Sequence, residues 1–280
     1  MQFRRVITAP DEMSAGGSRQ NTAVVQGSAN ECTDFYLTDE QDGGMTAAQQ
    51  LYIADLVMAY RRRFPALVIN AVWDFGKEEG DPAEGPKYGR FSESKVHAVY
   101  NAQMLTVSLN HALLRGMPCE ADAAEIQNIM REYQRELRCT EKAAHLEGEL
   151  LSDGLPWPKV GDRMMQILDI RPCRENGLQL RDPYFADVQA IRRLEDTQSL
   201  ERILVHEMGH MLFEESGVIS DRRLRKLFAE CRDGFEDLYE FCAECFMAAE
   251  MTRKAPGNDN GERSVIPLAE EVMRIFKDSK

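Results

Sequence analysis

Two histidines four residues apart, His206 and His210, lie in an otherwise apolar segment and constrain the fold of this chain more than any other feature. The flanking stretches 200–205 and 211–213 are rich in Leu, Ile, Val, Met and Phe, which is typical of a buried helix. Residues i and i+4 share one face of a helix, so both imidazoles project from the same side. Burying two unpaired imidazoles is costly, so this face needs hydrogen-bond partners or a bound ion.

The full segment His206-Glu207-Met208-Gly209-His210 predicts a zinc-dependent hydrolase. Two imidazole nitrogens can bind one zinc ion at about 2.0–2.1 Å each. Glu207 lies roughly 100° around the helix, so it can reach a water in the ion's open position rather than the ion itself. Zinc lowers the pKa of that water toward about 7, and the carboxylate takes its proton as the water attacks a carbonyl. The simpler alternative is a core helix with two hydrogen-bonded histidines.

A catalytic zinc needs a third protein ligand, and three glutamates downstream are candidates. Glu236, Glu240 and Glu244 are spaced i, i+4 and i+8, which places them on one face of a predicted helix. Like charges at this spacing repel one another by a few tenths of a kcal/mol, and a cation opposite them would reverse that effect. For this stretch alone a solvated acidic face is the simpler interpretation, although Phe241 and Phe246 indicate that the helix is partly buried.

The two motifs together resemble the glutamate-type zincin metallopeptidases. His-Glu-x-Gly-His followed by Glu-Phe-x-Ala-Glu-x-Phe at 240–246 is similar to the anthrax lethal factor type and to minimal zincin domains of toxins, effectors and phage-associated proteins. The resemblance covers 199–250 and, more loosely, 46–75 and 96–110. It implies that Glu240 is the third zinc ligand and Glu244 a supporting residue. From their spacing alone, Glu236 and Glu244 remain alternative ligands. It also implies that a strand within 98–110 lies at the sheet edge and binds extended substrate.

The chain departs from the zincin pattern at one position. The pattern carries a tyrosine about seven residues before the third ligand, which stabilises the developing oxyanion, and this chain has Asp233 there. Tyr239, Tyr100 or His97 can take over this role, and the sequence does not rank them. The departure favours a second hypothesis, a zincin scaffold that serves as a binding or structural module. A third hypothesis is a zinc hydrolase of a non-protein substrate.

We expect an α+β, zincin-like fold with a small twisted mixed sheet, a backing helix, an active-site helix and a helical C-terminal part. Residues 1–45 are predicted to form a flexible arm, because 9–31 is rich in Gly, Ser, Ala, Asn and Gln and offers little apolar surface to bury. Residues 46–280 are predicted to form a single catalytic domain with a helical insertion at about 111–160.

Apolar periodicity and turn residues predict the individual elements. The predicted helices are 46–63, 121–151 (one helix or a pair), 198–215, 220–232, 235–253 and 264–277. The predicted strands are 66–73 and 104–109, with an ambiguous strand at 165–170, a hairpin turn at 176–177 and a loop over 76–90.

The net charge, the apolar runs and the cysteines limit which partners and which cellular compartment we expect for the chain. A formal charge of −13 argues against a nucleic-acid binder, which needs a basic surface. The start of the chain does not resemble a secretory signal. No run approaches the roughly 20 apolar residues of a membrane-spanning helix. The seven cysteines do not form a disulfide pattern. We therefore predict a cytoplasmic protein, or one exported without a cleaved signal, that binds zinc and acts on a protein or peptide. Cys242 and Cys245 are interpreted as buried structural thiols.

Overall fold

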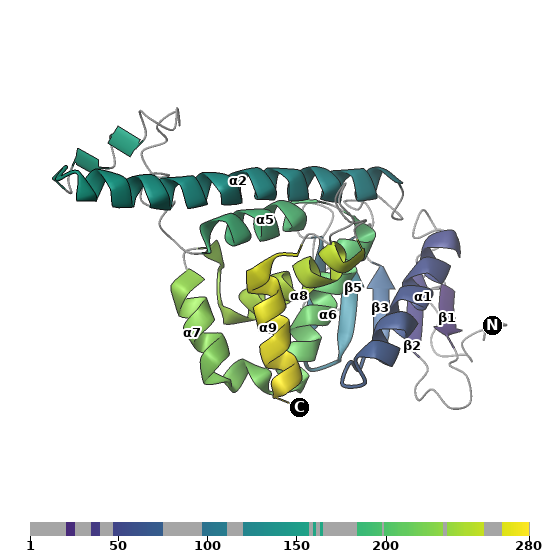
Figure 1. Ribbon diagram of the computed structural model, residues 1–280. Coiled ribbons are helices and arrows are strands. Elements are labelled where there is room, and N and C mark those ends of the chain that lie inside the picture. The colour runs from purple at the N-terminus through teal and green to yellow at the C-terminus, as the bar shows by residue number, and fades with distance from the viewer. Residues whose placement is uncertain are drawn as a thin grey trace. The chain divides into compact units, whose positions relative to one another are not determined.

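The structure is a computed structural model of mixed α+β class (Figure 1). It describes residues 21–25, 35–39, 47–74, 97–110, 120–156, 159–160, 163–164, 184–197, 199–231, 234–254 and 265–279. Its residues form two compact units. The first unit comprises 1–122 and 197–219 together with Lys280, and the second comprises 123–196 and 220–279.

A five-stranded mixed sheet organises the first unit. The strands β1 (Asn21–Val25), β2 (Phe35–Asp39), β3 (Ala71–Asp74), β4 (Ala98–Asn101) and β5 (Thr106–Leu109) are arranged in the order β1-β2-β3-β5-β4. The three central strands β2, β3 and β5 are parallel, and the outer strands β1 and β4 each run antiparallel to their neighbour. The small mixed sheet expected from the sequence is therefore present, with β4 as one edge strand.

Two of these strands lie in the segment that we expected to be a flexible arm, so that expectation is wrong for 21–25 and 35–39. Their pairing is antiparallel, from Asn21 opposite Asp39 to Val25 opposite Phe35. Strand pairing satisfies backbone hydrogen bonds that an isolated extended segment cannot satisfy alone. Composition alone does not register such long-range pairing, and the rest of 1–45 lies outside the described residues.

The helix predicted at 46–63 is confirmed as α1 (Ala47–Arg63), which ends two residues before Pro65. One face is buried through Ile53, Val57 and Tyr60. The strand expected at 66–73 is shorter than predicted, because a turn occupies 65–66 and extended pairing begins only at Ala71.

A tight hairpin joins β4 to β5. Leu105 adopts a left-handed backbone conformation with φ 54°, which is uncommon for a side chain of this size. Asn70 fixes the turn from outside, since its backbone N–H donates to the Leu105 carbonyl at 2.8 Å and its side-chain amide donates to the Met104 carbonyl at 3.0 Å. The Asn101 carboxamide oxygen accepts the Met104 N–H at 3.1 Å. These contacts fix the end of the edge strand.

The second unit is helical over the residues described. It contains most of α2 (Glu120–Ser152) together with α5 (Phe185–Glu195), α7 (Arg222–Cys231), α8 (Leu238–Lys254) and α9 (Pro267–Asp278), and a short 3-10 turn at Val218–Ser220 precedes α7. The segment predicted as one helix or a pair is a single 33-residue helix, α2. The predicted helices at 220–232, 235–253 and 264–277 are confirmed with shorter bounds, whereas α5 was not predicted. Helix α8 contacts α5, α7 and α9.

Several expectations fall outside the described residues, namely the loop at 76–90, the ambiguous strand at 165–170, the hairpin turn at 176–177 and Asp233. Among the helices that the structure does describe, none is long and apolar enough to cross a membrane.

Candidate metal centre

Helix α6 (Leu200–Glu215) belongs to the first unit and carries the histidine motif, as predicted for 198–215. Leu204, Val205, Met208, Met211 and Leu212 are fully buried, so the helix is surrounded by packing on most sides. Its carboxyl end is closed by Gly217, whose φ of +67° suits a residue without a β-carbon. The apolar flanks that were visible in the sequence therefore produce the buried helix that the motif requires.

The two histidine rings converge on the same point. The Nε2 atoms of His206 and His210 are 3.1 Å apart, and the rings meet edge to face with an interplanar angle of 78°. Two nitrogens that each lie about 2.0–2.1 Å from one tetrahedral ion are about 3.3 Å apart. The observed separation fits a shared ion. It also fits a hydrogen bond between a protonated and an unprotonated ring nitrogen, which is the core-histidine alternative.

Glu207 is buried, with an exposed fraction of only 7%. A carboxylate is rarely buried unless it is paired or placed for a reaction. Its position next to His206 on α6 puts it on the flank of the histidine face, as the helical rotation predicts. Glu207 thus lies on the buried flank of the helix face that carries the two imidazoles.

In the second unit, Glu240 lies in the first turn of α8 and is half-buried. The helix begins at Leu238 because the preceding Asp237 caps it. One carboxylate oxygen of Asp237 accepts the backbone N–H groups of Tyr239 and Glu240, at 2.7 and 2.9 Å. The cap fixes the backbone from which the Glu240 side chain projects. Sequence reasoning missed Asp237, although Asp followed three residues later by Glu is a helix-start signal.

The three glutamates do not share one solvated face. Glu236 is exposed and precedes the start of α8, so the predicted i, i+4, i+8 series is wrong at its first member. Glu244 is only 6% exposed, and the helix is buried continuously from Phe241 to Thr252. The solvated acidic face that we considered the simpler interpretation of this stretch is therefore wrong.

The candidate oxyanion donors differ in their surroundings. Tyr239 is 46% exposed on the first turn of α8. Tyr100 lies on β4 and is half-buried, and His97 lies just before that strand. Asp233, which occupies the position where the zincin pattern has tyrosine, is outside the described residues.

The cysteines of α8 behave as predicted. Cys242 and Cys245 are both free and fully buried. Burial raises the pKa of each thiol well above its ordinary value, so both remain protonated. The predicted burial of both thiols is confirmed, and a buried, protonated thiol is a poor nucleophile.

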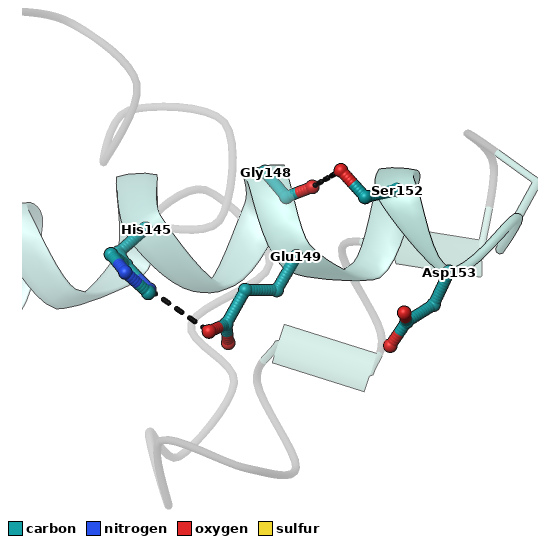
Figure 2. A pocket seen from close by; sticks show the side chains of 5 residues that line it. All are labelled: His145, Gly148, Glu149, Ser152 and Asp153. Carbon is teal, nitrogen blue, oxygen red and sulfur yellow. Dashed lines mark hydrogen bonds and ion pairs between the residues drawn. The ribbon is translucent and has the colours of Figure 1, made fainter.

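One open hollow lies along α2 and contains none of the predicted site residues (Figure 2). It is lined by His145, Gly148, Glu149, Ser152 and Asp153. His145 Nδ1 lies 3.3 Å from the Glu149 carboxylate, and the Ser152 hydroxyl donates to the Gly148 carbonyl at 2.8 Å. Its described walls come from one end of a single helix and its neighbouring turn, so polar groups from different elements do not converge there.

Comparison of the chain with family models, curated proteins and solved structures finds no match. The zincin resemblance therefore continues to rest on the motif residues themselves.

Proposed function

We propose that the chain is a zinc-dependent metallopeptidase of zincin-like fold, with His206, His210 and Glu240 as zinc ligands and Glu207 as general base and acid. One observation carries the proposal. The ligand atoms offered by the three proposed zinc ligands all lie within 4.8 Å of one another, and this is the one such group of His, Cys, Asp and Glu side chains found among the described residues. The two motifs that select these residues are 30 positions apart in the sequence.

The donor set suits the proposed ion. Two neutral imidazoles and one carboxylate leave one position of a four-coordinate zinc open, which is the arrangement of catalytic rather than structural sites. When bound, zinc supplies Lewis acidity and lowers the pKa of a water toward about 7. The edge-to-face arrangement of His206 and His210 already directs both Nε2 atoms to one region. Little rearrangement of these two side chains is therefore needed for metal binding.

Glu207 moves the proton in this proposal. Its carboxylate accepts a proton from the attacking water as the oxygen adds to the substrate carbonyl carbon. The same group, now a carboxylic acid, returns that proton to the amine nitrogen as the C–N bond breaks. Burial of Glu207 keeps competing bulk water away from the carboxylate and strengthens its electrostatic interactions with the reacting groups.

The edge strand β4 offers a surface for an extended peptide. It contacts α6, it pairs with β5 on one side, and its four residues are only partly buried. An unpaired strand edge presents backbone N–H and C=O groups that can pair with an added strand. Backbone pairing along β4 would hold a substrate beside the helix that carries His206 and His210.

The proposal is tested by measuring zinc content and peptide cleavage on the same preparations. We expect about one zinc per chain in the wild type, and we expect the Glu207→Gln variant to keep its zinc while losing cleavage of a peptide library by at least about 10²-fold. Glu207→Gln preserves size and hydrogen-bonding capacity, so it removes the base without removing a ligand. Equal cleavage by the two forms would contradict the assigned chemistry. A zinc-loaded wild type that cleaves no peptide would instead favour the binding or structural module, or a non-protein substrate.

A further inference from the structure

Tyr100 lies on the edge strand β4. It pairs with Val107 in the antiparallel ladder, and β4 contacts α6 within the first unit. The charges that act on its phenol are those of Glu214 and Glu215, in the last turn of α6. Glu214 follows His210 by four residues, so it lies one turn further along the face that carries both histidines. Tyr100 is therefore on a strand that contacts α6, and one of the two charges that act on its phenol belongs to the helix face that carries both histidines.

The Tyr100 hydroxyl is buried and has no hydrogen-bond partner among the described residues. Leaving a buried hydroxyl without a partner is destabilising, and a tyrosine with a buried hydroxyl normally has such a partner. Phenylalanine would fill the same space without this cost. Among the described residues, no protein group therefore uses this hydrogen bond.

The surroundings of Tyr100 keep its phenol in the donor form. Burial, reinforced by the negative charges of Glu214 and Glu215, raises the pKa of Tyr100 well above its ordinary value of about 10. The hydroxyl thus carries its proton at every pH at which a peptidase of this type would work. An ionised acid such as an aspartate cannot donate in this way, whereas a neutral phenol can.

The hairpin holds this residue in place. The turn after β4 is fixed by the two hydrogen bonds from Asn70, although Leu105 adopts a left-handed conformation there. Strained backbone conformations persist only where surrounding contacts determine them. The result is a fixed edge strand that carries a neutral donor beside the helix with the histidine motif.

We propose that the Tyr100 hydroxyl donates a hydrogen bond to the substrate carbonyl oxygen as negative charge develops on it. The proposal rests on the proposed peptidase function and adds a catalytic residue to it. The proton stays on Tyr100 throughout, because the hydroxyl stabilises the oxyanion and transfers no proton itself. His97 Nε2 is likewise buried with no partner among the described residues. His97 is less suited because it lies just before β4, three residues from Tyr100, and side-chain alternation along an extended segment gives the two residues opposite faces. Tyr239 is less suited because it is 46% exposed, so water competes for its hydroxyl.

The test is a comparison of Tyr100→Phe with Tyr52→Phe. Tyr52 lies in the same unit and donates to Glu201 at 2.8 Å, so its replacement removes a tyrosine hydroxyl of structural function. We expect Tyr100→Phe to lower kcat by about 10²–10³-fold with KM and zinc content nearly unchanged. We also expect its thermal unfolding temperature to be equal to or above that of the wild type, since the lost hydroxyl has no partner. Tyr52→Phe should keep its kcat and unfold at a lower temperature.

The outcomes separate this inference from the proposed function. If wild type cleaves peptides and Glu207→Gln does not, but Tyr100→Phe cleaves like wild type, Tyr100 is not the donor and the peptidase proposal stands. A Tyr100→Phe variant that loses zinc or unfolds at a clearly lower temperature would show a structural role and overturn the inference. The inference is also overturned if Tyr239→Phe, rather than Tyr100→Phe, lowers kcat. A wild type that cleaves no peptide when loaded with zinc overturns both proposals.

Discussion

Replacing Asp187 with alanine should destabilise the second unit by about 2–4 kcal/mol. Asp187 lies on α5 and is only 5% exposed. One carboxylate oxygen accepts the Tyr133 hydroxyl of α2 at 3.0 Å, and the other accepts the Leu268 N–H at the start of α9 at 2.8 Å. The carboxylate therefore joins three helices and caps one of them.

The magnitude follows from these two contacts. A hydrogen bond to a charged group contributes about 1.5–3 kcal/mol, so two of them contribute about 3–6 kcal/mol. The cost of burying the carboxylate offsets part of this gain and lowers the net loss to the range above. Asp187→Asn keeps an oxygen for the Leu268 N–H and an amide for the Tyr133 hydroxyl, so it should cost less than about 1.5 kcal/mol.

The pH dependence gives a second test at the same position. Burial raises the pKa of Asp187 above the ordinary carboxyl value, although the hydrogen bonds from Leu268 and Tyr133 counteract part of this effect. The folded state therefore holds this proton more tightly than the unfolded state. The resulting stabilisation is complete below the ordinary value of about 4 and is lost as the pH rises through the folded-state value. Asp187→Asn cannot ionise, so its stability relative to wild type should improve as the pH rises from acidic to neutral.

The assay is urea unfolding followed by circular dichroism over a range of pH. Asp196→Ala is a matched control, because Asp196 is an exposed aspartate immediately after the same helix. Its effect should stay within about 0.5 kcal/mol. If Asp187→Ala also falls within that range, the hydrogen-bonded carboxylate does not join the helices as described. A stability difference between Asp187→Asn and wild type that does not change with pH would show that the pKa of Asp187 is not raised.

Three further predictions concern the second unit. Asp237→Ala removes the cap of α8, so it should lower the free energy of unfolding by about 1 kcal/mol and weaken zinc binding through Glu240. Asp237→Asn or Asp237→Ser should restore both the stability and the zinc affinity. Urea unfolding and zinc titration measure these two effects. Gly234→Ala should cost about 1–3 kcal/mol in urea unfolding, because a β-carbon there would lie 2.5 Å from Val188 Cγ1; a neutral effect would mean that α5 can shift. The Cys242 thiol should react with a thiol reagent at neutral pH only as fast as the protein unfolds, because burial raises its pKa; faster modification of the native chain would contradict that burial.

The sequence predicts the elements whose signals are local. Helix α1 follows from apolar spacing together with three arginines near its end and Pro65 after it, and α6 follows from the apolar residues around the histidine motif. Strands β1 and β2 could not be predicted in this way, because their extended structure depends on distant partners. Strand β1 pairs with β2, and β2 also pairs with β3. Val24 and Val25 in β1 and Phe35, Tyr36 and Leu37 in β2 favour extended structure, but a five-residue strand carries little information about a partner that lies elsewhere in the chain.

In the candidate site too, the local sequence predicts some positions, and contacts between distant residues determine the others. The positions of His206, Glu207 and His210 follow from helical geometry within five residues. The start of α8, by contrast, depends on Asp237, so Glu236 falls before the helix rather than on its face. The burial of Glu244 and of Asp187 depends on tertiary packing, which periodicity cannot reveal. Asp187 in particular has hydrogen-bond partners 54 and 81 residues away.

The central claim is that His206, His210 and Glu240 hold one zinc ion. Crystals of the zinc-loaded chain, with anomalous scattering recorded on both sides of the zinc absorption edge, test it most directly. We predict one anomalous peak bonded to Nε2 of each histidine and to a carboxylate oxygen of Glu240, at about 2.0–2.2 Å. A peak bonded to Glu236 or Glu244 instead of Glu240 would contradict the assigned ligand. Two imidazoles joined by a hydrogen bond, with no zinc between them, would contradict the metal site itself.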